Sequence, residues 1–414
     1  MNQPIVIVGA GHAGSELASA LRKRGHAGRI ILVGEEAHLP YQRPPLSKGF
    51  LLGKVAQSQL YLKTQAIYEQ NSIELRPATR VVSIDRTSQE LTLASGERLA
   101  YGKLVLATGS RPRRLGFPGV ELARLGNLLC LRTIADAEAL REKLQPGRRL
   151  VVIGGGYIGL EVAAVAVQQG LQVTVVEALP RLLARVTGAE VAAFIEKTHR
   201  AHGVSFRLGT TVAELELDPE GSQVRAVVTA GPDGAERLAV DLVLLGVGIV
   251  PNSELAAAAG LAVDNGIVVD EYAQTSDPAI LAIGDCTSQP SPHTGGRVRL
   301  ESVPNAMEQA RVAAATLTGQ PEASTAVPWF WSEQYGFRLQ MVGLSTGHDR
   351  CVTRQSPDGK EILAFYLKEG RLIAADVIGK PADFAAARRL VASRAALDPA
   401  RLADASVALG ELAA

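Results

Sequence analysis

Two stretches of the chain repeat one pattern of apolar residues and glycines. Residues 5–8 and 150–153 are short runs of Ile, Val and Leu, which are typical of a strand buried in a parallel sheet. Glycines follow each run at once. After the first set of glycines, Ala13, Leu17 and Leu21 recur at helical spacing, which predicts a helix with one buried face. The pattern therefore predicts a strand, a tight turn and a helix, and it predicts them twice.

The first turn contains Gly9, Gly11 and Gly14 in the spacing GxGxxG. At this spacing the first glycine permits the tight turn, the second lets a phosphate approach the backbone, and the third lets the helix pack close to the strand. The next predicted strand ends at Glu35, 21 residues after Gly14, where a carboxylate can bind ribose hydroxyls. The stretch predicts a dinucleotide site with its pyrophosphate at the positive helix end.

The second turn repeats these features 145 residues later, with Gly154, Gly156 and Gly159. Its acidic residue is Glu177, 18 residues after Gly159 at the end of the next predicted strand. Copies so far apart cannot be turns of one short repeat, so each heads its own nucleotide-binding unit. Two dinucleotides in one chain indicate a flavin and a nicotinamide, because hydride passes readily between them.

Composition narrows the functional classes. The length of 414 residues favours two or three domains. With 43 basic and 42 acidic side chains, the net charge of +1 provides no large field to attract nucleic acid or an anionic membrane. No apolar run approaches the roughly 20 residues of a spanning helix, and the N-terminal sequence lacks a secretion signal. We expect a cytoplasmic protein that binds neither nucleic acid nor membrane.

The chain has three cysteines, Cys130, Cys286 and Cys351, which lie far apart. They form no CxxC motif, so the sequence predicts neither a redox dithiol nor a metal site. Cys286 follows Asp285 directly and is expected to serve packing.

Two further segments, LVLATGSRPR (104–113) and ILAIGDC (280–286), complete a resemblance to the two-dinucleotide flavoproteins that include glutathione reductase. The resemblance implies an α/β fold with two Rossmann-like domains and a C-terminal α+β domain. It implies that the first copy binds FAD, that the second binds NAD(P)H, and that Asp285 contacts the flavin ribityl chain.

The same resemblance implies domain boundaries. The FAD-binding domain is expected to be discontinuous and to comprise residues 1–110 and 247–320. The NADH-binding domain is expected at residues 111–246, and the C-terminal domain, read as antiparallel strands followed by a helix, at residues 321–414.

Within that superfamily the chain resembles the reductases that supply ferredoxins of bacterial oxygenase systems. The segments that carry this likeness are LPYQRPPLSK (39–48), VVIGGGYIGLEVA (151–163), TSDPAILAIGDC (275–286), ESVPNAMEQAR (301–311) and PWFWSEQYGFRLQMVGLS (328–345). The likeness implies that NADH gives hydride to FAD and that the flavin passes single electrons to a 2Fe–2S ferredoxin. For the oligomeric state we expect a monomer or weak dimer.

Four residues are expected to be catalytic. Pro44 and Pro45 stiffen the segment before Lys48, and the resemblance places this cation beside the flavin with Glu161 facing it. Tyr157 is expected to cover the nicotinamide side and to move aside for NADH. The fourth residue is Trp331, which the resemblance favours over Trp329 as the tryptophan beside the flavin.

The resemblance also implies two sets of cofactor contacts. One contact is Val303, next to Pro304, which suits the first turn of a helix whose positive end faces the flavin. The FAD set is Gly9, Gly11, Ala13, Gly14, Glu35, Arg43, Lys48, Val81, Ala107, Thr108, Gly109, Arg132, Asp285 and Val303. The NADH set is Gly154, Gly156, Tyr157, Ile158, Gly159, Glu177, Arg185 and Gly248.

Cofactor choice depends on Glu177, because a carboxylate at the ribose position repels the 2′-phosphate of NADPH. Arg181 and Arg185 follow it and are a counter-signal, since an arginine can hold that phosphate. We expect the acid to dominate and NADH to be preferred. For the ferredoxin partner, we expect a basic contact at Arg311.

Two other functions remain open from the sequence. The first is an NADH oxidase or peroxidase that delivers electrons to oxygen species. The second is a flavoprotein like the apoptosis-inducing flavoproteins, in which polyanion binding matters. The near-neutral charge and the absence of a basic run argue against the second.

Overall fold

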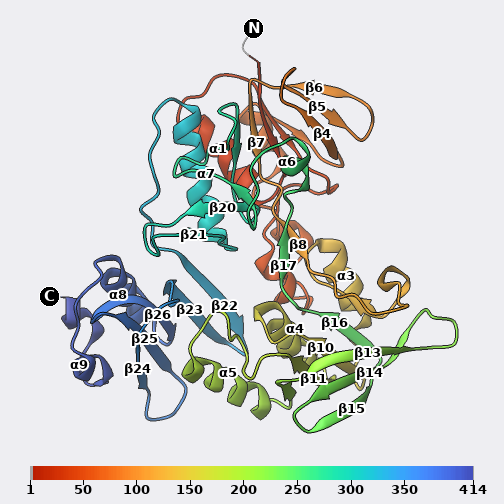
Figure 1. The fold of residues 1–414 in the computed structure, drawn as a ribbon, viewed down its shortest axis with the longest axis vertical. Coiled ribbons are helices and arrows are strands. Elements are labelled where there is room, and N and C mark those ends of the chain that lie inside the picture. Colours follow the sequence, from red (N-terminus) through yellow and green to blue (C-terminus); the bar gives the residue numbers. More distant parts are fainter. Residues whose placement is uncertain (1–2, 414) are drawn as a thin grey trace. The chain divides into compact units, whose positions relative to one another are not determined.

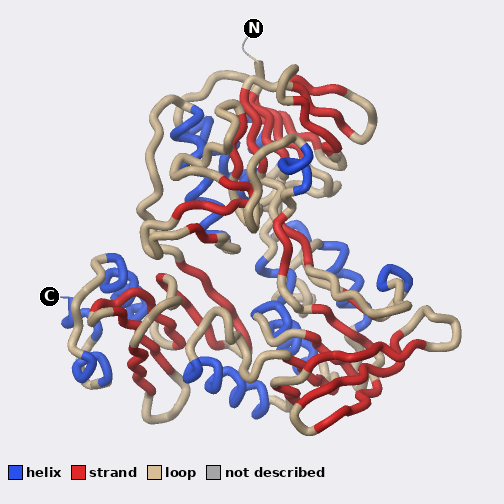
Figure 2. The backbone as a smooth tube through the Cα atoms, in the orientation of Figure 1, coloured by secondary structure: helices blue, strands red, loops and turns tan. Residues whose placement is uncertain are grey.

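The computed structural model describes residues 3–413, which divide into two compact units (Figure 1). Unit 1 comprises the chain up to Gln42, Gln57–Arg111 and Val250–Phe330. Unit 2 comprises Arg43–Ala56, Pro112–Ile249 and the chain from Trp331 onward. Both units combine helices with sheets (Figure 2), as the α/β fold class predicted.

Unit 1 is built on a five-stranded parallel sheet with β1 (Ile5–Val8) in its centre. Its order is β19 (Ile280–Ala282), β7 (Lys103–Leu106), β1, β2 (Ile30–Val33) and β3 (Ile73–Arg76). Helix α1 (His12–Lys23) follows β1, and α7 (Val303–Leu317) packs against α1. The other helices of this unit are α2 (Gln65–Gln70) and α6 (Glu254–Ala258).

Smaller sheets complete unit 1. An antiparallel sheet is formed by β4 (Val81–Asp85), β5 (Glu90–Leu93) and β6 (Arg98–Ala100). A second small sheet is formed by β18 (Ile267–Val268), β20 (Thr287–Pro290) and β21 (Arg297–Val298). Strands β8 (Ser110–Pro112) and β17 (Ile249–Pro251) pair where the chain passes from one unit to the other.

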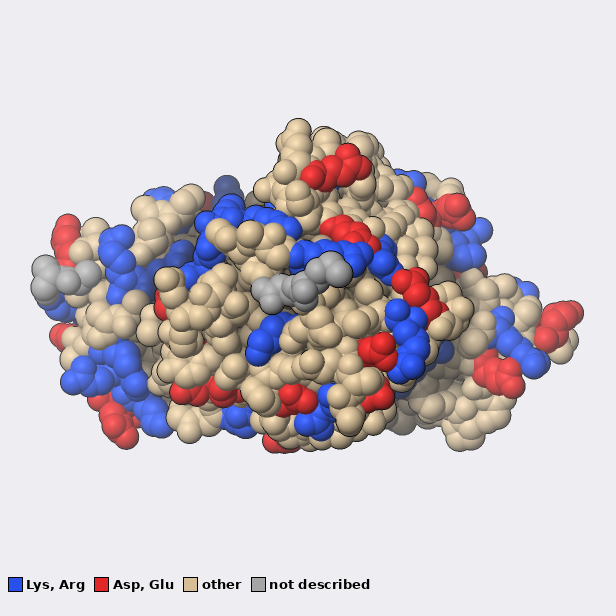
Figure 3. Space-filling view, turned by 90° about the horizontal axis from the view of Figure 1, so that it is seen from above, with Lys and Arg blue, Asp and Glu red and all other residues tan. Residues whose placement is uncertain are grey.

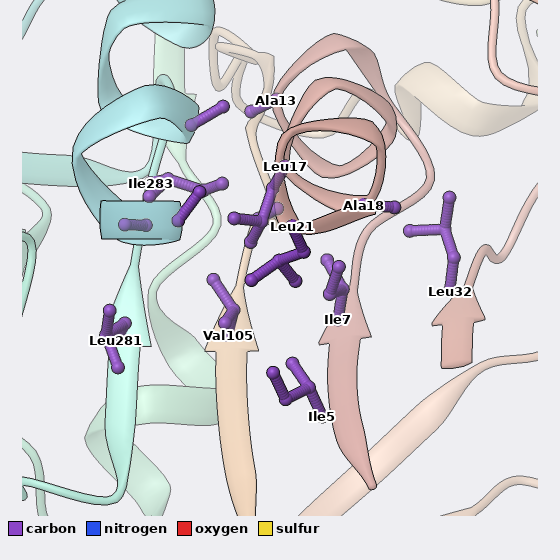
Figure 4. Packing of buried hydrophobic residues seen from close by; sticks show 14 of the residues in the cluster. Ile5, Ile7, Ala13, Leu17, Ala18, Leu21, Leu32, Val105, Leu281 and Ile283 are labelled. Carbon is purple, nitrogen blue, oxygen red and sulfur yellow. The ribbon is translucent and has the colours of Figure 1, made fainter. Parts of the chain in front are cut away.

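Strand β1 is hydrophobic throughout because both faces of its sheet are buried. Ile5 and Ile7 belong to the cluster under α1, whereas Val6 and Val8 belong to the cluster on the other face. In α1, Ala13, Leu17 and Leu21 all point into the first cluster, as their spacing predicted (Figure 4). This packing fixes the start of α1 at the carboxyl end of β1.

Unit 2 repeats the parallel sheet with β10 (Arg149–Ile153) in its centre. Its order is β12 (Ser205–Leu208), β11 (Gln172–Glu177), β10, β16 (Leu242–Leu245) and β9 (Leu128–Leu129). The helices that follow strands of this sheet are α3 (Ile134–Lys143), α4 (Tyr157–Gln168) and α5 (Ala189–Ala201). An antiparallel sheet of β13 (Thr211–Leu217), β14 (Val224–Gly231) and β15 (Gly234–Ala239) packs on one face.

The C-terminal part of the chain forms an antiparallel sheet followed by helices, as predicted. The strand order is β22 (Trp329–Gln334), β23 (Phe337–Gly343), β26 (Arg371–Ile378), β25 (Ile362–Lys368) and β24 (Arg350–Gln355). Helices α8 (Pro381–Ala392) and α9 (Pro399–Ala403) follow. Short 3₁₀ turns lie at Pro44–Ser47, Gln57–Gln59, Leu122–Arg124 and Leu409–Ala413.

The compact units group the chain differently from the three predicted domains. Residues 43–56 and the C-terminal sheet belong to the same unit as the second glycine turn. The boundaries at 110, 246 and 320 therefore stay a prediction about domains. Within residues 3–413, none of the helices is long and apolar enough to cross a membrane.

Candidate cofactor sites

The first glycine loop (residues 9–14) lies between β1 and α1. Gly9 has a φ of +117°, and a Cβ there would overlap the carbonyl oxygen of Ala107. A Cβ at Gly14 would overlap the carbonyl oxygen of Gly9. Gly11 has open space around the position of a Cβ. The outer glycines are thus required by backbone packing, and the middle glycine leaves room that a phosphate group fits.

Most of the predicted FAD contacts of unit 1 gather around this loop. Ala107, Thr108 and Gly109 follow β7, the neighbour of β1. Asp285 follows β19, and its Oδ2 accepts a hydrogen bond from Ser110 Oγ at 3.0 Å. Parallel strands end at one edge of a sheet, so these residues meet at the carboxyl edge where α/β folds bind ligands.

The helix start that carries Val303 also lies in unit 1, where α7 packs against α1. Ser302 caps α7 by accepting a hydrogen bond from the Asn305 N–H, and Pro304 lies in the first turn as predicted. The positive end of α7 is therefore well formed, although its role toward a flavin stays a prediction.

Glu35 lies two residues beyond the end of β2 rather than inside the strand. Its carboxylate lies 3.7 Å from the Arg80 guanidinium, and both side chains are more than two-thirds exposed. Such an exposed ion pair contributes little and does not prevent a hydroxyl from binding. Val81 follows Arg80 at the start of β4, so this predicted contact lies beside Glu35.

His12 adds an observation that points to a ligand in unit 1. Its Nδ1 is buried and has no hydrogen-bond partner among the described residues. Burial lowers the pKa of the imidazole, which favours the neutral form. A buried polar atom without a partner is costly, so a ligand group beside the first turn of α1 would satisfy it. The residues present therefore fit a bound dinucleotide.

The second glycine loop (residues 154–159) has the same construction. A Cβ at Gly154 would overlap the carbonyl oxygen of Gly246, and a Cβ at Gly159 would overlap that of Gly154. At Gly156 the nearest atom lies 3.9 Å from the position of a Cβ, so the middle glycine again leaves space.

The Glu177 carboxylate holds the second loop from the end of β11. It accepts hydrogen bonds from the backbone N–H of Gly155 at 2.6 Å and of Leu179 at 2.8 Å. A carboxylate has about four acceptor positions, so two remain for ribose hydroxyls. This geometry fits the predicted ribose contact.

The two arginines after Glu177 differ in their surroundings. Arg181 donates to the carbonyl oxygens of Thr187 and Ala184, at 2.7 and 3.0 Å, and so stabilises its own loop. Arg185 is exposed, and its Nη2 lies 3.6 Å from the position of a Cβ at Gly248. The structure therefore brings Arg185 and Gly248 together beside the second loop. Ile158, at the start of α4, is exposed as well.

Lys48 and Glu161 form an ion pair in unit 2, with 2.6 Å between Nζ and Oε2. The Glu161 side chain is 3% exposed and the Lys48 side chain 18%. Ser47 Oγ donates to the same Oε2 at 2.5 Å, and Ser332 Oγ donates to Oε1 at 2.6 Å. A buried charge requires a partner and hydrogen bonds, and Glu161 has both.

Ser47 and Ser332 were not among the predicted site residues. Both lie inside the segments that carry the family likeness, LPYQRPPLSK and PWFWSEQYGFRLQMVGLS. In β22 the tryptophans lie on one face, so Ser332 and Gln334 lie on the other. Two buried polar residues alternating in a strand were a signal that could have revealed them.

The other predicted catalytic and FAD-binding residues of unit 2 also make defined contacts. Tyr157 OH donates to Met341 Sδ at 2.8 Å. Arg43 donates to the carbonyl oxygen of Arg132 at 2.6 Å, so these two predicted FAD contacts touch each other. The Arg338 guanidinium lies 5.7 Å from the Trp331 ring centroid. Lys48, Arg43 and Arg132 are the predicted FAD contacts that belong to unit 2.

The three cysteines are all free thiols. Cys286 is fully buried, and burial raises its pKa. Burial also raises the pKa of Cys130, and it raises that of Cys351 to about 12. Since the thiolate is the reactive form, all three sites disfavour thiol redox chemistry.

Comparison with known families agrees with this architecture. Residues 3–310 match the pyridine nucleotide-disulphide oxidoreductase family, and residues 329–413 match the reductase C-terminal family. The chain therefore belongs to the pyridine nucleotide-disulphide oxidoreductases and has their fold of two Rossmann-like domains.

Individual relatives narrow the likeness to one branch. The chain is 46% identical to putidaredoxin reductase of Pseudomonas putida, covering 100% of this chain and 97% of that protein. It is 43% identical to the ferredoxin–NAD(+) reductase component of the anthranilate 1,2-dioxygenase system of Burkholderia cepacia, covering 98% of each. Its fold matches the reductase in a crystal structure of the covalent putidaredoxin reductase–putidaredoxin complex, with a TM-score of 0.95, 46% identity, and coverage of 99% and 98%.

Proposed function

We propose that this protein is an FAD-dependent NADH:ferredoxin oxidoreductase, with FAD at the first glycine loop and NADH at the second. The observation that carries the proposal is the presence of two complete dinucleotide-binding folds in one chain. When bound, the nicotinamide supplies a hydride and the flavin allows its two electrons to leave singly. Two relatives of nearly equal length, one named putidaredoxin reductase and one named a ferredoxin–NAD(+) reductase component, support this assignment.

The electron acceptor that we propose is a 2Fe–2S ferredoxin that serves an oxygenase. Support comes from the covalent complex of a relative with putidaredoxin and from the oxygenase system of another relative. The raised pKa of every cysteine thiol supports direct electron transfer, since no thiol is suited to act as a relay. Replacing all three cysteines with serine should therefore leave NADH-to-ferredoxin turnover largely intact.

The proposed catalytic residues would act at the reacting end of the two cofactors. Lys48 would supply a fixed cation, because Glu161 holds its ammonium group and Glu161 is itself held by Ser47 and Ser332. Tyr157 would cover the nicotinamide position. Its hydroxyl donates to the Met341 sulfur atom, which is a weak acceptor.

Arg311 is our proposed contact for the ferredoxin. In the free protein its guanidinium already binds Glu308 and Glu322, at 2.9 and 2.7 Å, and is 41% exposed. An acidic partner would therefore exchange with these carboxylates rather than meet an unpaired cation. On the face seen in Figure 3, acidic and basic side chains are interspersed. We further propose a monomer or weak dimer.

The Arg311 contact can be tested by Arg311→Glu. This change should slow association with the ferredoxin and weaken its dependence on salt, since steering is electrostatic. Reduction of the flavin by NADH should be unaffected, because it does not involve the partner. An unchanged rate with ferredoxin would place the contact elsewhere.

The function as a whole is tested by NADH-driven cytochrome c reduction with and without added 2Fe–2S ferredoxins. We expect strong stimulation by at least one ferredoxin and slow NADH consumption without it. Rapid NADH loss to oxygen, unaffected by any ferredoxin, would instead identify an NADH oxidase. The same assay with hydrogen peroxide distinguishes a peroxidase.

A further inference from the structure

A series of hydrogen-bonded polar side chains leads from Glu161 through the interior of unit 2. Ser332 Oγ donates to Glu161 Oε1 at 2.6 Å, and Gln334 Nε2 donates to Ser332 Oγ at 3.1 Å. His199 Nε2 lies 2.6 Å from Gln334 Oε1, and Tyr335 OH lies 3.1 Å from His199 Nδ1. This series of hydrogen bonds joins α4, β22 and α5, and the Glu161 carboxylate is the charged group at one end of it.

One arrangement of hydrogens satisfies every link. The amide oxygen of Gln334 can only accept, so His199 Nε2 must carry the hydrogen. In this neutral tautomer Nδ1 is an acceptor, which receives the Tyr335 hydroxyl. Ser332 accepts from Gln334, so its own hydrogen goes to Glu161. Every donor in the chain is therefore directed toward the Glu161 carboxylate.

Burial makes this arrangement stable. Ser332 and His199 are fully buried, and Gln334 is 3% exposed, so bulk water does not compete for their hydrogen bonds. Burial lowers the pKa of His199 to about 4, which keeps the imidazole neutral near pH 7. A neutral His199 preserves the tautomer that the chain requires.

The hydrogen-bonded series orients Glu161. It does not conduct protons, because an amide such as Gln334 does not readily pass a proton from nitrogen to oxygen. The other groups that face Glu161 are Ser47 and Lys48 from the turn Pro44–Ser47 and its cap, and Tyr157 one turn earlier in α4. Without Ser332, the Oε1 atom loses this hydrogen bond, and the carboxylate is then held through Oε2 by Ser47 and Lys48. The direction of the Lys48 ammonium group would then be less well defined.

We infer that Ser332, Gln334 and His199 are positioning residues that hold Glu161, and through it Lys48, in one orientation for hydride transfer. This inference rests on the proposed function, in which Lys48 lies beside the flavin. It extends the reacting site by a polar chain from the C-terminal sheet and α5.

The kinetic test uses the FAD-loaded protein and anaerobic stopped-flow reduction by NADH. Ser332→Ala should lower the limiting rate of flavin reduction about tenfold, as expected for the loss of a hydrogen bond to a charged group. The Kd for NADH should stay within about twofold, because Ser332 is not among the predicted NADH contacts. Ser332→Thr restores the hydroxyl and should recover the rate. Ser205→Ala, at an exposed position in the same unit, is the matched control.

A second measurement does not depend on activity. In ¹⁵N NMR spectra of histidine-labelled holoprotein at pH 6, His199 should be neutral and carry its hydrogen on Nε2. Gln334→Met removes the acceptor, so this tautomer should lose its preference. If the unmodified protein is reduced by NADH but Ser332→Ala retains its rate, or if His199 is protonated at pH 6, the inference is wrong. If NADH does not reduce the unmodified protein, the proposed function is wrong. The NMR result still tests the hydrogen bonds of His199 and Gln334.

Discussion

The two glycine loops have the same backbone, but the helices that follow them differ in the environment of one ion pair. Counted from the first glycine, Glu16 of α1 corresponds to Glu161 of α4. Each glutamate binds a lysine from a distant segment, Lys63 at 2.7 Å and Lys48 at 2.6 Å. The Glu16 side chain is 26% exposed, whereas the Glu161 side chain is 3% exposed and carries two additional hydroxyl donors.

The repeated motif therefore fixes the backbone, whereas other segments of the protein decide the chemistry. The turn Pro44–Ser47 and strand β22 cover Glu161, and neither has a counterpart in the motif itself. The first copy instead has His12 where the second has Tyr157, with an unsatisfied buried nitrogen beside its loop. One copy is thus suited to holding a ligand, and the other also presents a buried charge pair.

The largest expected difference between the copies is in stability. Glu161→Gln leaves Lys48 largely buried without its partner and should lower the free energy of unfolding by about 3–5 kcal/mol. Glu16→Gln removes a pair that is more exposed and should cost about 0–1 kcal/mol. Urea unfolding of both holoproteins gives the two values. Equal losses would show that the two pairs are equivalent.

The second copy also depends on the C-terminal sheet through Asp376. This buried carboxylate accepts hydrogen bonds from Tyr366, at 2.6 Å, and from Thr187 in the loop after Glu177. Burial raises the pKa of Asp376 from 3.8 to about 6. The folded state therefore binds this proton more tightly than the unfolded state does, and stability from this group is lost as the pH rises from about 4 to 6.

Asp376→Asn should remove that pH dependence. The shift corresponds to about 3 kcal/mol, so the unfolding free energy of the unmodified protein should fall by up to that amount, relative to the variant, between about pH 4 and 7. Urea unfolding at several pH values measures the difference. Parallel pH profiles for the two proteins would mean that Asp376 does not titrate in this range.

Alanine substitutions in the two glycine loops should affect the binding of different cofactors. Gly9→Ala places a Cβ against the Ala107 carbonyl at a φ of +117° and should weaken FAD binding about a hundredfold. Gly154→Ala should leave FAD in place and weaken NADH binding to a similar degree. Gly116→Ala, which has open space around its Cβ, is the control. Loss of FAD from both loop variants alike would contradict separate sites.

The smallest expected effect concerns cofactor choice. Glu177→Gln should lower kcat/KM for NADH about tenfold, because it weakens both the ribose contact and the hold on Gly155. Discrimination against NADPH should fall, with Arg185 able to bind the 2′-phosphate, because Arg181 is engaged by backbone carbonyls. Adding Arg185→Ala should remove any gain with NADPH. Equal use of both nucleotides by the unmodified protein would show that Glu177 does not set the preference.

The sequence predicted those features that depend on neighbouring residues. Glycine spacing anticipated both loops, and the spacing of Ala13, Leu17 and Leu21 anticipated the buried face of α1, because each rests on local geometry. The contacts of Ser332 and His199 could not be predicted in this way. Ser332 lies 171 residues from Glu161, and Gln334 lies 135 residues from His199. Local periodicity contains no information about such pairings.

Local periodicity also gives no reason to group residues 43–56 with the second copy in one compact unit. These residues follow the first copy in sequence. However, their turn Pro44–Ser47 contacts α3 and α4, and Lys48 pairs with Glu161 of α4. Arg181 is a second example, since from the sequence it was only a counter-signal to Glu177 and the structure revealed the carbonyl oxygens that it binds.

The central claim is that hydride from NADH leaves the protein as single electrons to a ferredoxin. Its most direct test is an anaerobic titration, in which FAD-loaded protein receives NADH in the presence of excess oxidised 2Fe–2S ferredoxin. We expect two ferredoxin molecules to be reduced for each NADH consumed, with the flavin returning to its oxidised form. A flavin that stays reduced beside oxidised ferredoxin, and reoxidises only when oxygen is admitted, would contradict the claim.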